Sequence, residues 1–131
     1  AQIINLLAQL QRELNLTVLF ISHDLRVVRH ITHRVMVMYL GSNVEVGPTG
    51  EIFRHPAHPY TQVLTKAAPK LDPLNRRREY AIEGEPPSPI NTPSGCKFHP
   101  RCPYCTDKCR QEVPELREIA PGHLCACHYP L

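Results

Sequence analysis

The stretch Leu16–Gly41, LTVLFISHDLRVVRHITHRVMVMYLG, indicates the fold class of this chain. It opens with an apolar run over residues 16–21, which is typical of a strand buried on both faces of a parallel sheet. The polar triplet SHD at 22–24 interrupts the run and can cap a helix, which we expect over about residues 24–33. A second apolar run follows at residues 35–40, and we expect a strand over residues 34–40. Strand, helix and strand in this order predict a βαβ unit of an α/β protein.

The segments on either side of this stretch add helices and a hairpin. Apolar residues recur at three- and four-residue steps over residues 1–15, which predicts an amphipathic helix. Residues 44–46 follow a glycine-containing turn and predict the second strand of a β-hairpin at the sheet edge. Two further helices are expected, over residues 51–54 and 60–68. Residues 70–94 are rich in charge and proline, and we interpret them as a linker.

His23 is the residue of this stretch with the clearest potential for chemistry. It stands at the carboxyl end of the predicted strand, where open α/β sheets bind their ligands. It also stands beside a helix N-terminus, which favours anions. A histidine that faces a phosphate is therefore one interpretation, and a polar residue that merely helps to cap the helix is the other. Asp24 has a structural reason to exist as an acid at the start of a helix.

Composition limits the size and the class of the protein. The chain has 131 residues, enough for one modest domain or two small ones. Its net charge of +3 is too small to predict nucleic-acid binding. No apolar segment approaches the roughly 20 residues of a membrane helix, and no signal peptide is visible. We therefore expect a protein of the cytoplasm that reaches a membrane surface only through a partner.

The last third of the chain has a different character from the first. All six cysteines follow residue 95, and most of the 14 prolines follow Pro48. Thiolates are soft ligands that suit zinc or an iron–sulfur cluster. A disulfide framework is the alternative, although the α/β segment of cytoplasmic type upstream favours a metal. The cysteine spacing matches neither the common ferredoxin run nor paired C-x2-C motifs, and nearby His99, His123 and His128 leave mixed zinc ligation open.

Two kinds of catalytic site have no support in this sequence. The chain holds no G-x-x-x-x-G-K-[ST] loop, so it cannot cradle the phosphates of a nucleotide alone. Ser22 and His23 are neighbours but lack the context of a nucleophile elbow. A hydrolase triad is therefore not expected.

At this point the residues resemble those of one family. The segments LTVLFISHDLRVV and HRVMVMYLGSNVEVGPTGEIFRHPAHPYTQVL are similar to the C-terminal part of the ATP-binding subunit of bacterial ABC importers for oligopeptides, dipeptides or nickel. The segments GEPPSPINTPSGCKFHPRCP and GHLCACH resemble the C-terminal extension of these importers. The resemblance covers essentially the whole chain. It implies a C-terminal fragment of a P-loop ABC ATPase at residues 1–54, then a small, irregular, proline-rich, metal-stapled extension at residues 55–131.

The resemblance also implies a function. Such a subunit couples hydrolysis of ATP, bound with Mg²⁺, to import of oligopeptides, dipeptides or a nickel complex, and His23 would be its switch histidine, contacting the γ-phosphate. The Walker A loop and the other nucleotide motifs would precede Ala1, so we expect this chain alone to lack ATPase activity. The strands at residues 16–21 and 34–40 would also lack neighbours and would expose apolar surface.

The partners follow from the same resemblance. They would be a second ATP-binding subunit, identical or similar, two transmembrane permease subunits and, indirectly, an extracytoplasmic solute-binding protein. Nucleic acid is not expected as a partner. The location would be peripheral, at the cytoplasmic face of the bacterial inner membrane.

The extension of this family implies a metal centre. Matched residue by residue, the ligands of a [4Fe–4S] cluster would be Cys96, Cys102, Cys109 and Cys127. Zinc is the alternative, because Cys102 and Cys105 could form a C-x2-C pair. On a second reading of the chain, the extension is a metal-stapled interaction module with no catalysis of its own.

Overall fold

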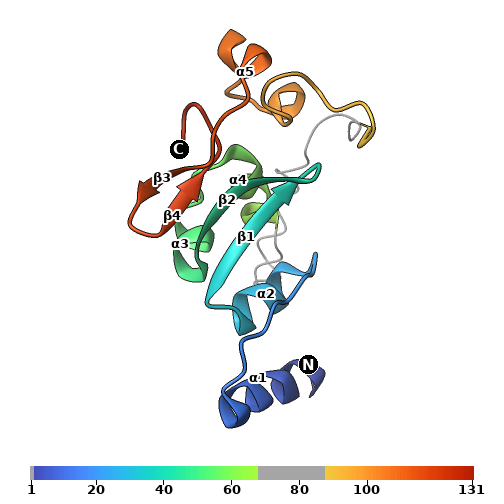
Figure 1. The fold of residues 1–131 in the computed structure, drawn as a ribbon, viewed down its shortest axis with the longest axis vertical. Coiled ribbons are helices and arrows are strands. Elements are labelled where there is room, and N and C mark those ends of the chain that lie inside the picture. Colours follow the sequence, from blue (N-terminus) through green and yellow to red (C-terminus); the bar gives the residue numbers. More distant parts are fainter. Residues whose placement is uncertain (1, 68–87) are drawn as a thin grey trace, which may run out of the picture.

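The computed structural model describes residues 2–67 and 88–131. Figure 1 shows α1 and α2 at one end of the molecule, the sheet in the middle and α5 at the other end. The elements are α1 (Gln2–Leu14), α2 (Leu25–Ile31), β1 (Arg34–Tyr39), β2 (Ser42–Pro48), α3 (Thr49–Arg54), α4 (Pro59–Ala67), the 3₁₀ helix η1 (His99–Arg101), α5 (Asp107–Gln111), β3 (Arg117–Ala120) and β4 (His123–Cys125). In the described part of the chain, no helix is long and apolar enough to cross a membrane.

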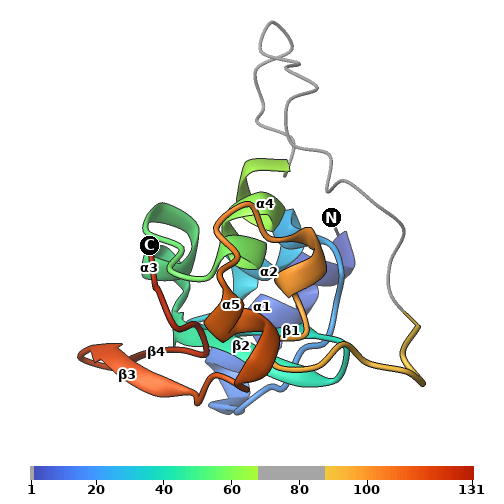
Figure 2. The same cartoon turned by 90° about the horizontal axis from the view of Figure 1, so that it is seen from above.

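The sheet is antiparallel, with the strand order β1-β2-β4-β3. β1 and β2 form the predicted hairpin, in which Tyr39 pairs with Ser42. The two turn residues, Leu40 and Gly41, both have positive φ, as a tight hairpin turn of this length requires. β3 and β4 extend the sheet beyond β2, so residues of the predicted extension supply half of its strands. Figure 2 shows α3 and α4 on the same side of this sheet.

The prediction of a βαβ unit with a strand at residues 16–21 is wrong for this structure. These residues form no strand, and among the described residues no strand pairs with them. Their apolar side chains are largely exposed, with Leu19 at 89% and Ile21 at 88%. An apolar run becomes a buried parallel strand only where neighbouring strands and covering helices take up its backbone groups and both faces. The predicted exposure of apolar surface is confirmed here, whereas residues 34–40 find their partner in β2.

The predicted helices are present with slightly shifted bounds. Asn15, with φ of 52°, ends α1 in the left-handed conformation common at helix C-termini. Asp24 caps α2 because its Oδ1 accepts a hydrogen bond from the Arg26 N–H at 3.0 Å. Most of the predicted linker at residues 70–94 lies outside the described residues, and residues 88–94 contain no helix or strand.

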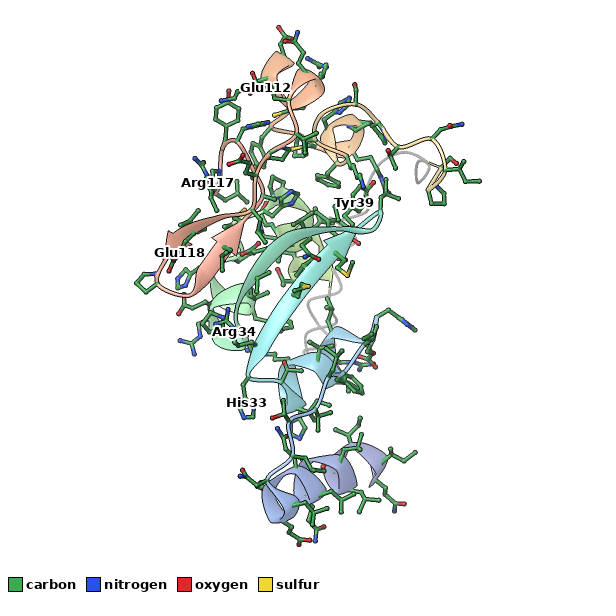
Figure 3. All side chains as sticks on the ribbon, in the orientation of Figure 1. His33, Arg34, Tyr39, Glu112, Arg117 and Glu118 are labelled. Carbon is green, nitrogen blue, oxygen red and sulfur yellow. The ribbon has the colours of Figure 1, made fainter. Side chains whose placement is uncertain are left out.

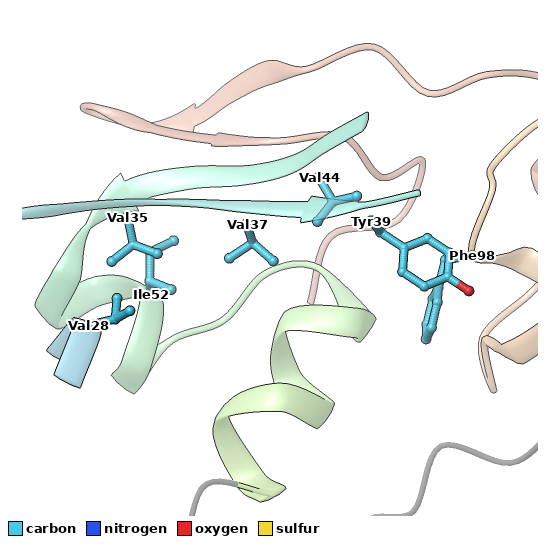
Figure 4. Close-up of a cluster of buried hydrophobic side chains, with 7 residues drawn as sticks. All are labelled: Val28, Val35, Val37, Tyr39, Val44, Ile52 and Phe98. Carbon is cyan, nitrogen blue, oxygen red and sulfur yellow. The ribbon is translucent and has the colours of Figure 1, made fainter. Parts of the chain in front are cut away.

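The hydrophobic core lies between the β1–β2 hairpin and the helices on one side of it. Burial alternates along β1, as expected for a strand with one covered face. Figure 4 shows the buried side chains pointing from the hairpin toward α2, α3 and α4 and reaching Phe98 of the C-terminal region. The rings of Tyr39 and Phe98 meet edge to face, with centroids 5.3 Å apart. The cluster comprises Val28, Val35, Val37, Tyr39, Val44, Ile52 and Phe98.

A buried carboxylate joins three separate segments of the fold. Glu45, in the middle of β2, is 0% exposed. Its Oε1 accepts from the backbone N–H of His58 at 2.8 Å, and both of its oxygens accept from the N–H of Ala57, at 3.1 and 3.0 Å. Its Oε2 also pairs with Nε2 of His123 on β4. A charge removed from water is tolerated only with such partners. We call this arrangement the Glu45 clamp.

The cysteine-rich segment folds back on itself through a tight backbone contact. The N–H of Cys96 donates to the carbonyl of Cys109 at 2.8 Å, and the Ser94 hydroxyl donates to the carbonyl of Arg110 at 2.9 Å. Gly95 lies between these contacts with φ of +66°. A Cβ placed on Gly95 would stand only 2.4 Å from the carbonyl oxygen of Cys109. Only glycine therefore fits at the point where the segment around residue 95 contacts the backbone of Cys109 and Arg110.

We predict that Glu45→Ala destabilises the protein by about 3–5 kcal/mol, the cost of breaking a buried, hydrogen-bonded charge pair. The change leaves the N–H groups of Ala57 and His58 and the ring of His123 without their acceptor. Urea unfolding followed by circular dichroism measures the loss. The matched control is Glu51→Ala, whose exposed ion pair with His55 at 3.2 Å should contribute less than about 1 kcal/mol. Similar losses for the two variants would contradict the clamp.

We also predict that Gly95→Ala destabilises the protein by at least about 2 kcal/mol more than Gly41→Ala. Both glycines have positive φ, so each variant carries the left-handed strain of roughly 1–2 kcal/mol. Nothing lies within 4 Å of a Cβ on Gly41, whereas the backbone at Cys109 and Arg110 blocks one on Gly95. Unfolding of the two variants side by side isolates the steric contribution. Equal losses of unfolding free energy would show that the backbone around Gly95 shifts to make room for the Cβ.

Candidate functional site

A pocket gathers four cysteines from separate parts of the C-terminal region. Cys96 precedes η1, Cys102 follows it, Cys109 lies in α5, and Cys127 follows β4; all four line the pocket. They are the four cysteines expected from the resemblance to be ligands. The pocket therefore brings together cysteines up to 31 positions apart (127 − 96).

The remaining two cysteines do not line this pocket. Cys125 is fully buried on β4 and pairs in register with Glu45 of β2. Burial raises the pKa of the Cys125 thiol, and the neighbouring Glu45 carboxylate raises it further. The thiol of Cys105 donates to the carbonyl of Thr106. The backbone N–H of Cys105 donates to the carbonyl of Cys102 at 3.3 Å, so Cys105 follows Cys102 in a tight turn, although its side chain does not line the pocket.

The segments that carry the pocket cysteines are held by hydrogen bonds to the rest of the fold. The N–H of Ala126 donates to the carbonyl of Val44 at 2.8 Å and so ties the chain before Cys127 to the core hairpin. The Arg117 guanidinium donates to the carbonyl of Cys127 at 3.4 Å, and the His128 ring donates to the carbonyl of Glu112 at 2.8 Å. Figure 3 labels Glu112 near α5 and Arg117 at the start of β3.

All six cysteines are free thiols, so the disulfide alternative is not what the structure contains. Burial raises the pKa of Cys102 to about 11 and also raises the pKa of Cys96 and Cys127, and neighbouring cysteines contribute to each shift. These thiols therefore stay protonated near neutral pH. Their thiolates need a nearby positive charge, which a metal centre supplies.

The geometry does not form a ready site for a single ion. Within residues 2–67 and 88–131, no three His, Cys, Asp or Glu side chains are grouped so that they could hold one metal ion. The pocket holds four thiols, which suit iron–sulfur chemistry, and it is also lined by aromatic side chains. His99 and His128 lie in the same lining, so the mixed cysteine and histidine ligation of zinc stays open. Phe98, 1% exposed, and the partly exposed Tyr104 and Tyr129 form much of the apolar lining.

His58 lies in the wall of the same pocket, a position that the sequence did not reveal. It is 1% exposed, and its Nδ1 accepts a hydrogen bond from the N–H of Tyr60 at 3.0 Å. Burial lowers the pKa of His58 to about 4, so the ring is neutral at physiological pH. The available signal was the repeated HPxHP pattern at residues 55–59, in which each proline restricts the residue before it.

Glu45 is the second important residue that sequence reasoning missed. Alternation along Val44, Glu45 and Val46 assigns the acid to the solvent-exposed face of a strand. Only the fold therefore reveals that Glu45 is buried and that Ala57, His58 and His123 are its partners.

His23 lies away from the cysteine pocket. Its side chain is exposed and directly precedes Asp24, the cap of α2. Figure 1 shows α2 and α5 well separated along the long axis of the molecule. The chain therefore carries two separate candidate sites.

Comparison with known proteins supplies the family. A family profile described as "Oligopeptide/dipeptide transporter, C-terminal region" matches residues 44–109. The chain is 56% identical over 98% of its length to a probable peptide ABC transporter ATP-binding protein of Sinorhizobium fredii, covering 36% of that protein. It is 52% identical over 98% of its length to a dipeptide transport ATP-binding protein of Haemophilus influenzae, covering 39% of it.

A third relative is similar over the same part of the chain. The chain is 51% identical over 98% of its length to an oligopeptide transport ATP-binding protein of Bacillus subtilis, covering 40% of that protein. It thus spans roughly two fifths of the length of these curated relatives. The family profile and these relatives agree on one assignment: the chain belongs to the family of ATP-binding proteins of oligopeptide and dipeptide ABC transporters, and it includes their characteristic C-terminal region.

Proposed function

We propose that this chain is the C-terminal part of the energy-coupling subunit of an ABC importer, in which hydrolysis of ATP with Mg²⁺ drives peptide uptake. The observation that carries the proposal is identity above 50% over nearly the whole chain to three ATP-binding proteins with peptide-transport names. Oligopeptides or dipeptides are the proposed cargo. A nickel complex, the other cargo implied by the resemblance, has no support in the names of these relatives.

The proposed partners follow from this role. They are a second ATP-binding subunit, two transmembrane permease subunits and, indirectly, an extracytoplasmic solute-binding protein. The subunit would sit peripherally at the cytoplasmic face of the inner membrane. We retain the division into residues 1–54, from the nucleotide-binding domain, and residues 55–131, the extension. Pairing of β4 with β2 supports an extension that packs on its own domain.

We propose that His23 is the switch histidine, which polarises the γ-phosphate and helps to position the attacking water. Its alternative role as a helix cap is filled by its neighbour, because the carboxylate of Asp24 accepts from the Arg26 N–H. Phosphoryl transfer is catalysed mainly by positioning and by polar groups aimed at developing charge. An exposed imidazole at the start of α2 is suited to this task once nucleotide and the partner subunit are present.

We predict that His23→Ala in the full-length subunit lowers ATP turnover by about 10²–10³-fold, the usual cost of removing one transition-state donor. Peptide uptake should fall with it, and ATP binding should remain. ATP hydrolysis, labelled-peptide uptake and nucleotide binding by the assembled transporter provide the three measurements. His30→Ala is the control, since His30 is an exposed histidine of α2, the helix that follows His23. Normal ATP turnover in His23→Ala would contradict the role of His23 as the switch histidine.

We further propose that Cys96, Cys102, Cys109 and Cys127 bind a [4Fe–4S] cluster. Their common pocket and free thiols support this choice. Four thiols in one pocket lining match the four cysteine ligands of a cubane, and zinc is the alternative.

The bound cluster would act as a structural staple. Its charge would stabilise the thiolates that burial disfavours, and its four bonds would join segments that share little regular secondary structure. The protein contributes the ligands, an apolar wall and the tight turn at Gly95.

We predict that the chain purified without oxygen is brown and contains iron and sulfide at about four per chain, the stoichiometry of a cubane. Cys102→Ser should lose most of this iron, because Cys102 lines the pocket. Cys105→Ser, the matched control, should keep it, because Cys105 lies outside the pocket lining. Elemental analysis and visible absorbance measure both. A colourless protein with one zinc, lost equally in the two variants, would favour the C-x2-C site instead.

A further inference from the structure

A backbone hydrogen bond determines which ring nitrogen of His58 carries the proton. Tyr60 donates its N–H to Nδ1 of His58 at 3.0 Å, so Nδ1 uses its lone pair and carries no proton. In a neutral imidazole the proton then lies on Nε2. His58 therefore presents one ring donor, Nε2–H.

The position of this donor is also determined before any ligand binds. Oε1 of Glu45 holds the His58 backbone N–H at 2.8 Å, and the ring stands 5.8 Å from that of Phe98, centroid to centroid. The side chain is 1% exposed and forms part of the wall that the four cysteines share. Within the described residues, none of the hydrogen bonds of His58 involves Nε2.

We propose that His58 donates its Nε2–H to a sulfur of the cluster bound in this pocket, as a positioning residue and not as a metal ligand. This inference rests on the proposed cysteine-bound cluster. A histidine nitrogen that binds a metal must be free of its proton and of other partners. Nδ1 is occupied by Tyr60 and Nε2 is protonated, so His58 serves as a hydrogen-bond donor.

A donor of this kind has a measurable consequence. Hydrogen bonds to cluster or cysteine sulfur stabilise the reduced, more negative state and so raise the reduction potential. The effect is strong in an apolar pocket, because the local dielectric constant is low. His58 should therefore influence the potential without altering the number of iron atoms held.

The decisive experiment is a redox titration of the anaerobically purified chain and of two variants with opposite chemistry. In His58→Asn, the side-chain oxygen can still accept from the Tyr60 N–H, but the donor at the Nε2 position is lost. In His58→Gln, the longer amide can return an N–H to that position. We expect normal iron and sulfide in both, a more negative potential for His58→Asn, and a potential near that of the original chain for His58→Gln.

The outcomes distinguish failure of the His58 hydrogen bond from failure of the proposed cluster. An unchanged potential in His58→Asn with full iron content would overturn the role of His58 and leave the cluster in place. An original chain that holds no iron would overturn the cluster and, with it, this inference. Loss of iron in His58→Asn alone would identify His58 as a ligand and overturn the donor role.

A second measurement tests the tautomer directly. Long-range ¹⁵N–¹H correlation spectra of histidine-labelled chain should show His58 as the neutral ring with its proton on Nε2. A proton on Nδ1 would contradict the hydrogen bond from Tyr60 and overturn the proposal. This test works on the chain before and after iron is added.

Discussion

The Glu45 clamp is the interaction on which the rest of this structure depends. A carboxylate that is fully buried costs several kcal/mol unless its oxygens are satisfied. Here the satisfaction comes from two backbone N–H groups before α4 and from His123 on β4. One side chain on β2 thus forces the chain after α3 and the last strand into place together. The C-terminal region is joined to the same fold by this clamp and by Phe98, which packs in the hydrophobic core.

The Glu45 clamp also helps to position the wall of the cysteine pocket. Glu45 holds the backbone of His58 in the pocket wall, and its register partner on β4 is Cys125, two residues before Cys127. Because β4 pairs with β2, Cys127 lies close to the segment that contains Cys96 and Cys102. Burial raises the pKa of Cys96, Cys102 and Cys127, and the pocket that they line lies against the aromatic core.

The two ends of the molecule differ in how far their apolar side chains are buried. Around β1 and β2, apolar side chains find partners in three helices and in Phe98. Around residues 16–21, comparable side chains remain exposed because the described chain offers no strand beside them. His23 lies beside the exposed apolar segment, and the cysteine pocket lies at the end where the side chains are covered.

The sequence by itself determined the local elements and the family. Periodicity predicted α1, α2 and the β1–β2 hairpin, because amphipathic spacing and a glycine turn are properties of neighbouring residues. The motifs around the cysteines identified the relatives, and four of the six cysteines do share one pocket. The strand expected at residues 16–21 failed, because a parallel strand depends on neighbours that no local pattern reports. Only the tertiary structure decided the antiparallel sheet order, the partners of Glu45 and the place of His58, since each depends on contacts between segments distant in the chain.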